Sequence, residues 1–282
     1  MNRRKFIQQG AFAAGAAAML AQLPQQLFAG ASAADIPVGF QSWILREEIG
    51  KNFAGLLKMM ADQGYKLVEM CSPKGYGGGF APLENMKPSE MRKIINDAGL
   101  TCPSCHFGFG ELNNDLDSRI EWSKELGLTH IVCSSFGLPK TATIDDWMAA
   151  ADKLNAAGEK IKKAGLQTGF HNHSVELTKI DDKLIYDELL KRFDKELVKL
   201  QFQTEVINLG YKGADYFNKY PGRFFSTHLS DWTADKKEAV IGQGVIDWKE
   251  FFAAAKKAGV KYYYVEMEAD KFKDSISYIN SL

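Results

Sequence analysis

Residues 144–173, with the sequence IDDWMAAADKLNAAGEKIKKAGLQTGFHNH, contain a helical pattern that is followed at once by a strand pattern. The helical pattern runs to Lys163, and the next residues include Gly165, which suits a left-handed helix end. The strand pattern ends in two histidines, His171 and His173. Alternate residues of a strand face the same side, so both imidazoles are expected to point toward one ion or substrate.

The same alternation of strand and helix continues along the chain without a linker or a low-complexity stretch. Strands are predicted at 38–45, 66–72, 101–107, 130–135, 167–173, 199–205, 224–230 and 262–268. Helices are predicted at 53–62, 88–97, 116–126, 144–163, 183–192 and 248–257. This order requires a parallel sheet with right-handed crossovers. Eight units favour a closed (β/α)₈ TIM barrel over an open doubly wound sheet, and we expect one such domain over residues 34–282.

The composition excludes some classes of partner. The chain has 282 residues, of which 45% are hydrophobic and 25% charged, as in an ordinary globular protein. Its 35 basic and 35 acidic residues give a formal net charge of zero. No general electric field would therefore draw it to nucleic acid or to an anionic membrane, and a small neutral ligand is expected instead.

The first 33 residues have the composition of an export signal. The adjacent arginines Arg3 and Arg4 precede an apolar stretch at 10–20, and the small residues 31–33 resemble a cleavage site. This order predicts a twin-arginine-like signal and a periplasmic mature protein, with a plain secretory signal as the alternative. The apolar stretch is shorter than the roughly 20 residues that span a bilayer, so we expect no stable membrane insertion after cleavage.

Polar and aromatic side chains gather where the predicted strands end. They are Trp43, Glu69, His106, Phe107, His171, His173, Glu176, Gln203, His228, Trp232 and Glu266. The carboxyl ends of the strands form the active-site face of a TIM barrel, so these side chains are expected to converge there.

Imidazole nitrogens together with carboxylate and amide oxygens are ligands that suit Mn²⁺, Co²⁺, Ni²⁺ or Zn²⁺ better than Mg²⁺. A cation bound there can bridge two sugar oxygens and acidify a hydrogen next to a carbonyl, while a carboxylate such as Glu266 or Glu69 moves the proton. His106 is either an acid or ligand of this site or a hydrogen-bonded structural residue. We expect catalytic roles for Glu69, His106, His173 and Glu266, and substrate contacts from Trp43, Phe107, Glu176 and Trp232.

Several segments of the mature chain carry a family resemblance. They are Gly64-Tyr-Lys-Leu-Val-Glu69, Gly169-Phe-His-Asn-His173 with Glu176, Tyr220-Pro-Gly-Arg223, His228-Leu-Ser-Asp-Trp232, Gly242-Gln-Gly-Val-Ile-Asp-Trp248 and Val265-Glu266. The chain resembles the xylose isomerase-like barrels, the sugar phosphate isomerase/epimerase superfamily that also holds ketose 3-epimerases, inosose dehydratases and endonuclease IV.

The resemblance implies a metal site. Members of the family commonly hold a metal with an acidic residue, an aspartate, a histidine and a glutamate from four successive strands. These positions correspond to His171 or His173, then Gln203, His228 and Glu266. Gln203 replaces the aspartate and a histidine replaces the first acidic ligand, so Glu266 would be the one anionic ligand. The metal would then bind less tightly and act as a stronger Lewis acid.

The predicted function is that of an exported, metal-dependent enzyme. It would isomerise or epimerise a non-phosphorylated sugar or keto-sugar by removing a proton next to a carbonyl. A dehydratase, or a lyase or hydrolase of keto-glycosides, would share this step. A periplasmic sugar-binding barrel without catalysis is the alternative from another class, motivated by the missing aspartate. An oligomer is compatible with the sequence.

Overall fold

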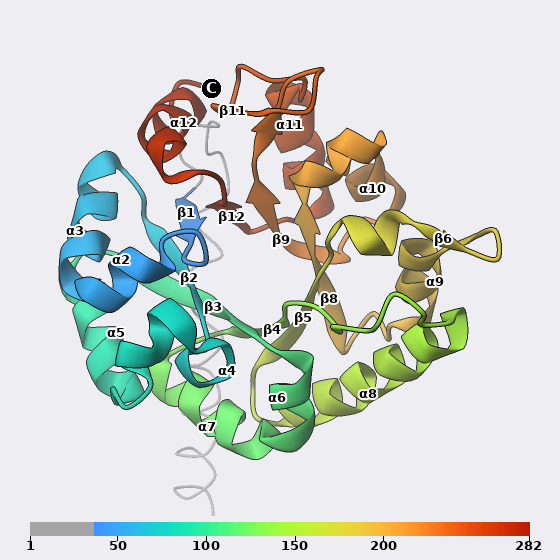
Figure 1. The fold of residues 1–282 in the computed structure, drawn as a ribbon, viewed down its shortest axis with the longest axis horizontal. Coiled ribbons are helices and arrows are strands. Elements are labelled where there is room, and N and C mark those ends of the chain that lie inside the picture. The colour runs from blue at the N-terminus through green and yellow to red at the C-terminus, as the bar shows by residue number, and fades with distance from the viewer. Residues whose placement is uncertain (1–36) are drawn as a thin grey trace, which may run out of the picture. The chain divides into compact units, whose positions relative to one another are not determined.

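A closed barrel of eight parallel strands forms the centre of the molecule. The computed structural model describes residues 37–282, so the predicted export signal lies outside the described residues. The strands follow the order β1, β2, β3, β4, β5, β8, β9, β12 around the barrel (Figure 1). Their bounds are β1 Val38–Gln41, β2 Leu67–Cys71, β3 Thr101–Phe107, β4 His130–Cys133, β5 Gln167–His171, β8 Val198–Gln203, β9 Phe224–Leu229 and β12 Tyr262–Val265. All eight predicted strands are present, and the prediction of a TIM barrel is confirmed.

Helices surround this barrel (Figure 1). Those that the sequence predicted are α3 Phe53–Gln63, α5 Pro88–Asp97, α7 Leu116–Leu126, α8 Ile144–Lys163, α9 Ile185–Arg192 and α11 Trp248–Ala258. Those that it did not are α2 Arg46–Lys51, α4 Pro73–Tyr76, α6 Phe109–Asn114, α10 Gly213–Lys219 and α12 Phe272–Ile279. Within residues 37–282, none of the helices combines the length and the apolar character that crossing a membrane requires.

Short elements fill the connections. They are the 3₁₀ helices η3 Gly78–Leu83, η4 Ser174–Leu177, η5 Thr204–Leu209 and η6 Ala269–Lys271, and the two-stranded pairs β6 Lys179–Ile180 with β7 Lys183–Leu184 and β10 Asp231–Trp232 with β11 Glu238–Ala239. η4, η5 and the β10–β11 pair each follow a barrel strand, so they line the face on which the strands end.

The helix α8 shows how the sequence fixes a helix boundary. Thr143 accepts a hydrogen bond from the backbone of Asp146, whose carboxylate accepts one from the Thr143 backbone N–H, which completes a capping box. The chain leaves the helix through Gly165, whose φ of 85° is a left-handed value. The buried face, which includes Trp147 and Leu154, lies next to β5. The predicted bounds of this helix are confirmed.

Two of the strands end earlier than the sequence predicted. The prediction continued the fifth strand to His173, but β5 ends at His171, and His173 is the first residue before η4. The last strand likewise ends at Val265, one residue before Glu266. His173 and Glu266 therefore lie in the segments that follow these strands, at the mouth of the barrel.

Two shifts in strand pairing decide which side chains enter the barrel. Between β2 and β3 the pairing shifts by one residue just before Glu69 and Ser104 come opposite each other. Between β8 and β9 it shifts just before Gln201 and Ser226. An extra residue in one strand reverses the alternation of its side chains beyond that point. The shift in β3 thereby places His106 on the same side as Glu69.

Candidate active site at the mouth of the barrel

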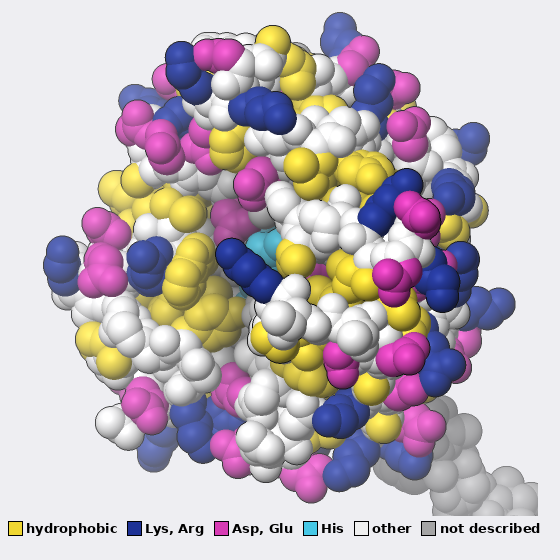
Figure 2. All heavy atoms as spheres, turned by 45° about the vertical axis from the view of Figure 1, so that its right-hand side comes forward, with side chains coloured by type: hydrophobic (Ala, Val, Ile, Leu, Met, Phe, Trp, Pro, Cys, Tyr) yellow, Lys and Arg dark blue, Asp and Glu magenta, His cyan; other side chains and the backbone are white. Residues whose placement is uncertain are grey.

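Three of the five histidines meet inside the carboxyl-terminal end of the barrel. They are His106 from β3, His171 from β5 and His228 from β9. Their ring centroids lie between 4.3 and 5.1 Å apart, and one nitrogen of each lies within 4.8 Å of the others. Figure 2 shows a hollow in this face, with histidine at its bottom and acidic side chains beside it. The convergence predicted from the strand ends is confirmed for these imidazoles.

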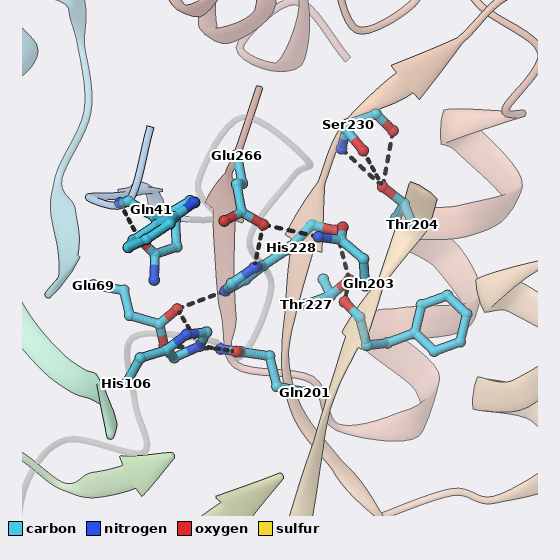
Figure 3. Close-up of polar contacts among 12 residues, drawn as sticks. Gln41, Glu69, His106, Gln201, Gln203, Thr204, Thr227, His228, Ser230 and Glu266 are labelled. Atoms are coloured by element: carbon cyan, nitrogen blue, oxygen red, sulfur yellow. Dashed lines mark hydrogen bonds and ion pairs between the residues drawn. The ribbon is translucent and has the colours of Figure 1, made fainter. Parts of the chain in front are cut away.

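His228 lies between two carboxylates (Figure 3). Its Nε2 is 2.5 Å from Glu69 Oε2, and its Nδ1 is 2.9 Å from Glu266 Oε2. Burial of the ring opposes its charge, but Glu266 and Glu69 outweigh this and raise the pKa of His228 to about 9. Without a bound cation, the two carboxylates favour the protonated form of His228.

Glu69 is fully buried and surrounded by donors. Its Oε1 accepts hydrogen bonds from Ser104 Oγ and Gln201 Nε2, while its Oε2 faces His228 and lies 3.2 Å from His106 Nε2. Burial disfavours the charged form, yet the two imidazoles hold the pKa of Glu69 well below its usual range. With its oxygens occupied and none exposed, Glu69 acts on the histidines and not on a substrate. The prediction that Glu69 moves a substrate proton is therefore wrong.

Glu266 is in a different position. Both of its hydrogen bonds, from His228 Nδ1 and from Gln203 Nε2, use Oε2, which leaves Oε1 for a ligand. Although burial favours the neutral acid, the neighbouring His228 lowers the pKa of Glu266. An ionised carboxylate therefore lies at the bottom of the hollow with one oxygen available.

The donor set fits a divalent cation. Among the four residues predicted to bind a metal, two buried atoms have no hydrogen-bond partner, namely Nδ1 of His171 and Oε1 of Gln203. Nδ1 of His228 and Oε2 of Glu266 lie 2.9 Å apart, so a cation that displaces the proton between them could bind to both. Behind them Glu69 holds the other nitrogen of His228, which is the usual carboxylate support of a metal-binding imidazole. The residues His171, Gln203, His228 and Glu266 are thus together, as the sequence predicted.

His173 and Glu176 lie at the rim. The ring of the exposed His173 is 4.7 Å from that of His171. Glu176 is fully buried, and its Oε2 accepts a 2.7 Å hydrogen bond from the His173 backbone N–H, which caps η4. One oxygen of Glu176 therefore caps η4, while the other, Oε1, is buried without a hydrogen-bond partner, and the predicted substrate contact of Glu176 stays a prediction.

Replacing Glu176 with glutamine is expected to stabilise the protein at alkaline pH. Burial raises the pKa of Glu176 from 4.5 to about 7. The folded state therefore holds this proton more tightly than the unfolded state, and wild-type stability falls as the pH rises from 4.5 to 7. Above that range the Glu176→Gln variant should be more stable by about 3 kcal/mol, and below it by almost nothing.

Denaturant titrations over this pH range check the prediction, with the exposed Glu196→Gln as control. A difference that does not depend on pH would contradict the assigned role. An unchanged KM in the variant would indicate a capping role alone, and a raised KM would indicate a substrate contact as well.

The three aromatic residues that the sequence predicted to contact the substrate lie in different surroundings. Trp43 is 39% exposed at the mouth, 5.6 Å from the ring of Tyr76. Trp232 lies in β10, where its Nε1 donates to Ser230 Oγ. Phe107 follows His106 in β3 and so faces away from the barrel interior. Its ring is fully buried between the barrel and α7, against Trp122. The prediction that Phe107 stacks on a sugar is therefore wrong.

Sequence analysis missed other residues of this site. Tyr76 comes from the glycine-rich connection after β2, in which no motif distinguished it. Gln201 is two residues before Gln203 in β8, on the same side of the strand, and contacts Glu69 and His106 (Figure 3). The alternation rule, applied from Gln203, could have found Gln201.

Comparisons with known proteins agree with this architecture. A family model described as xylose isomerase-like TIM barrel matches residues 57–282. An inosose dehydratase of Geobacillus thermodenitrificans is 27% identical over 249 residues, which cover 72% of this chain and 82% of that enzyme. An inosose dehydratase of Lacticaseibacillus casei is 26% identical over 151 residues, or 46% of this chain, and the match spans about half the length of that enzyme (50%).

Solved structures share the fold. A sugar phosphate isomerase/epimerase from Parabacteroides distasonis superposes with a TM-score of 0.75 at 22% identity, covering 88% of this chain and 96% of that one. The IolI protein with a bound zinc atom superposes with a TM-score of 0.64 at 13% identity, covering 87% and 94%. At these identities the likeness shows the fold alone. The family model spans most of the described barrel, and the chain belongs to the xylose isomerase-like TIM barrel family.

Proposed function

We propose that this chain is a metal-assisted enzyme that isomerises or epimerises a non-phosphorylated sugar or keto-sugar. The observation that carries the proposal is the meeting of His171, Gln203, His228 and Glu266, with two unpartnered atoms, in one hollow. The inosose dehydratases among its relatives act, by their name, on a related class of molecule. The overall reaction begins with removal of a proton next to a carbonyl.

The four residues would hold Mn²⁺, Co²⁺, Ni²⁺ or Zn²⁺ in preference to Mg²⁺, because two of them offer nitrogen. Such a cation would supply Lewis acidity toward sugar oxygens. The IolI protein, which has the same fold, was solved with a bound zinc atom, and this supports a metal in this chain.

The side chains around the hollow can move the proton. Oε1 of Glu266 is free and its carboxyl group is ionised, so it can accept a proton from the sugar carbon. His173 at the rim and His106 beside His228 can return a proton to the substrate. Trp43 offers an exposed ring at the mouth for the apolar face of a sugar.

Elimination is the second candidate reaction. A dehydratase, or a lyase or hydrolase of keto-glycosides, starts with the same proton removal and then expels a leaving group. The two inosose dehydratase relatives favour this outcome. The site residues are compatible with both reactions, because both reactions begin with the same proton removal.

Incubation with keto-sugars in heavy water separates these reactions. The probes are a ketohexose, a 3-keto-glucoside and an inosose, followed by mass spectrometry and proton NMR. Isomerisation or epimerisation should keep the carbon skeleton and add deuterium at the carbon next to the carbonyl. Elimination should give a product that has lost water or an alcohol. If no probe exchanges hydrogen and a chelator does not affect sugar binding, the proposed enzyme is contradicted and a sugar-binding barrel is favoured. The replacement of the family aspartate by Gln203 motivates this alternative.

The predicted location supports a free sugar as substrate. An exported protein would not meet phosphorylated cytoplasmic sugars, and we propose the periplasm on the basis of Arg3, Arg4 and the apolar residues that follow. Amino-terminal sequencing of the protein from a periplasmic extract tests this, and cleavage near residue 34 is the expected result.

A further inference from the structure

The floor of the hollow is a closed hydrogen-bond network centred on Gln201. Gln201 Nε2 lies 2.8 Å from Glu69 Oε1, and Gln201 Oε1 lies 2.7 Å from His106 Nε2 (Figure 3). Gln201 Nε2 also lies 2.8 Å from Ser226 Oγ. All of these residues are buried, with His106 5% exposed and the others fully covered. The network is therefore largely shielded from bulk solvent.

The direction of each hydrogen bond follows from Glu69. Donors from Ser104, Gln201 and His228 surround its two oxygens, so the carboxylate acts as acceptor throughout. The atom of Gln201 that faces Glu69 must then be its amide nitrogen, because a carbonyl oxygen there would repel the carboxylate. The amide oxygen of Gln201 is thereby left facing His106, and an amide oxygen only accepts.

The consequence concerns His106. Its Nε2 must donate, since both neighbours of this atom, Gln201 Oε1 at 2.7 Å and Glu69 Oε2 at 3.2 Å, are acceptors. In a neutral imidazole the other nitrogen, Nδ1, then carries a lone pair. We propose that Gln201 is a positioning residue that fixes His106 as the Nε2–H tautomer, so that Nδ1 is the one nitrogen through which His106 can accept a substrate proton or bind a metal.

The strand pairing shows that this arrangement is built into the barrel. The pairing shifts lie directly before Glu69 in the β2–β3 pair and before Gln201 in the β8–β9 pair. Without the shift in β3, residues 105 and 107 would face inward in place of Ser104 and His106. Such irregularities re-aim side chains beside functional sites, and here both bring partners of the network inside.

Long-range proton–nitrogen NMR of the isotope-labelled, metal-free chain at mildly alkaline pH tests the tautomer. His106→Gln identifies the His106 signals. In the wild type, Nε2 of His106 should appear as the protonated ring nitrogen and Nδ1 as the unprotonated one. A proton found on Nδ1 would overturn the proposal, and this reading of the wild type does not depend on whether any variant folds.

Two variants of the same residue type provide a matched comparison. Gln201→Leu removes the nearer of the two acceptors of His106 Nε2 and leaves Glu69 Oε2 at 3.2 Å, so the share of the Nε2–H tautomer of His106 should fall. Gln203→Leu, two residues further along β8, removes a contact to Glu266 and should leave the His106 signals unchanged. Equal effects of the two variants, or none from Gln201→Leu, would contradict the role of Gln201.

The proposed tautomer of His106 does not depend on the proposed function of the chain. The expected effect of Gln201 on catalysis does rest on that function. With an active substrate, Gln201→Leu should lower kcat by about 10- to 100-fold with little change in KM, as for other residues that orient a catalytic imidazole. If the Nε2–H signal of His106 is observed but the chain exchanges no hydrogen on any sugar, the proposed function is rejected and the tautomer proposal stands. An unchanged kcat in an active enzyme would reject the catalytic role of Gln201.

Discussion

The Glu266→Gln variant is expected to lose nearly all activity, with kcat lower by about a hundred- to ten-thousand-fold. The glutamine keeps the size of the side chain and can still accept a hydrogen bond. It cannot accept the substrate proton at Oε1, and it removes the one carboxylate among the four proposed metal-binding side chains. Initial rates of hydrogen exchange on the substrate measure the effect directly.

Glu268 provides the matched control for this variant. It lies two residues beyond Glu266, but its side chain is 70% exposed and forms an ion pair with Lys271 at the surface. Glu268→Gln should keep kcat within about twofold, because an exposed ion pair contributes little. Similar losses in both variants would show that Glu266 has no special role in the reaction.

The Asp231→Ala variant should have the largest effect on stability. Asp231 is fully buried, and its two oxygens accept hydrogen bonds from the backbone N–H groups of Trp232, Gly242, Gly244 and Ile246 and from the Trp248 indole. Gly244 lies so close that an added Cβ would be 2.1 Å from Asp231 Oδ1. Removal of the carboxylate leaves these donors unpaired and should lower the free energy of unfolding by about 3 to 5 kcal/mol.

Thermal unfolding checks this expectation, and a decrease of about 10 °C in Tm corresponds to it for a domain of this size. Asp235→Ala is the control, because Asp235 lies exposed in the same hairpin and contacts Thr233 and Lys237 at the surface. If Asp231→Ala unfolds at the same temperature as Asp235→Ala, the buried carboxylate does not hold this loop.

The order of the elements could be predicted because each strand and helix carries its own local pattern. The ends of α8 were correct since Thr143 and Gly165 are strong local signals. Short helices such as α4 and α10 were missed because one or two turns do not establish a helical period. Their positions depend on packing against the barrel.

The site was predicted less completely, for a physical reason. The strand-end pattern correctly brought His171, Gln203 and His228 together. It does not say how deep a side chain lies, so the sequence could not distinguish the buried Glu69 from the accessible Glu266. It also depends on an uninterrupted ladder, and the shift in pairing beside Glu69 arises between strands that are far apart in sequence.

Elemental analysis of the purified protein tests the central claim, a metal site at the mouth of the barrel, most directly. The wild type, His228→Ala and His130→Ala would be compared after incubation with Mn²⁺, Co²⁺, Ni²⁺ or Zn²⁺ and removal of excess ions. His130 is the control because it begins β4 at the opposite end of the barrel, stacked on Phe225. We predict one equivalent of metal in the wild type and in His130→Ala, and none in His228→Ala. A wild-type protein that retains no metal, or a His228→Ala variant that retains as much as the wild type, would contradict this account.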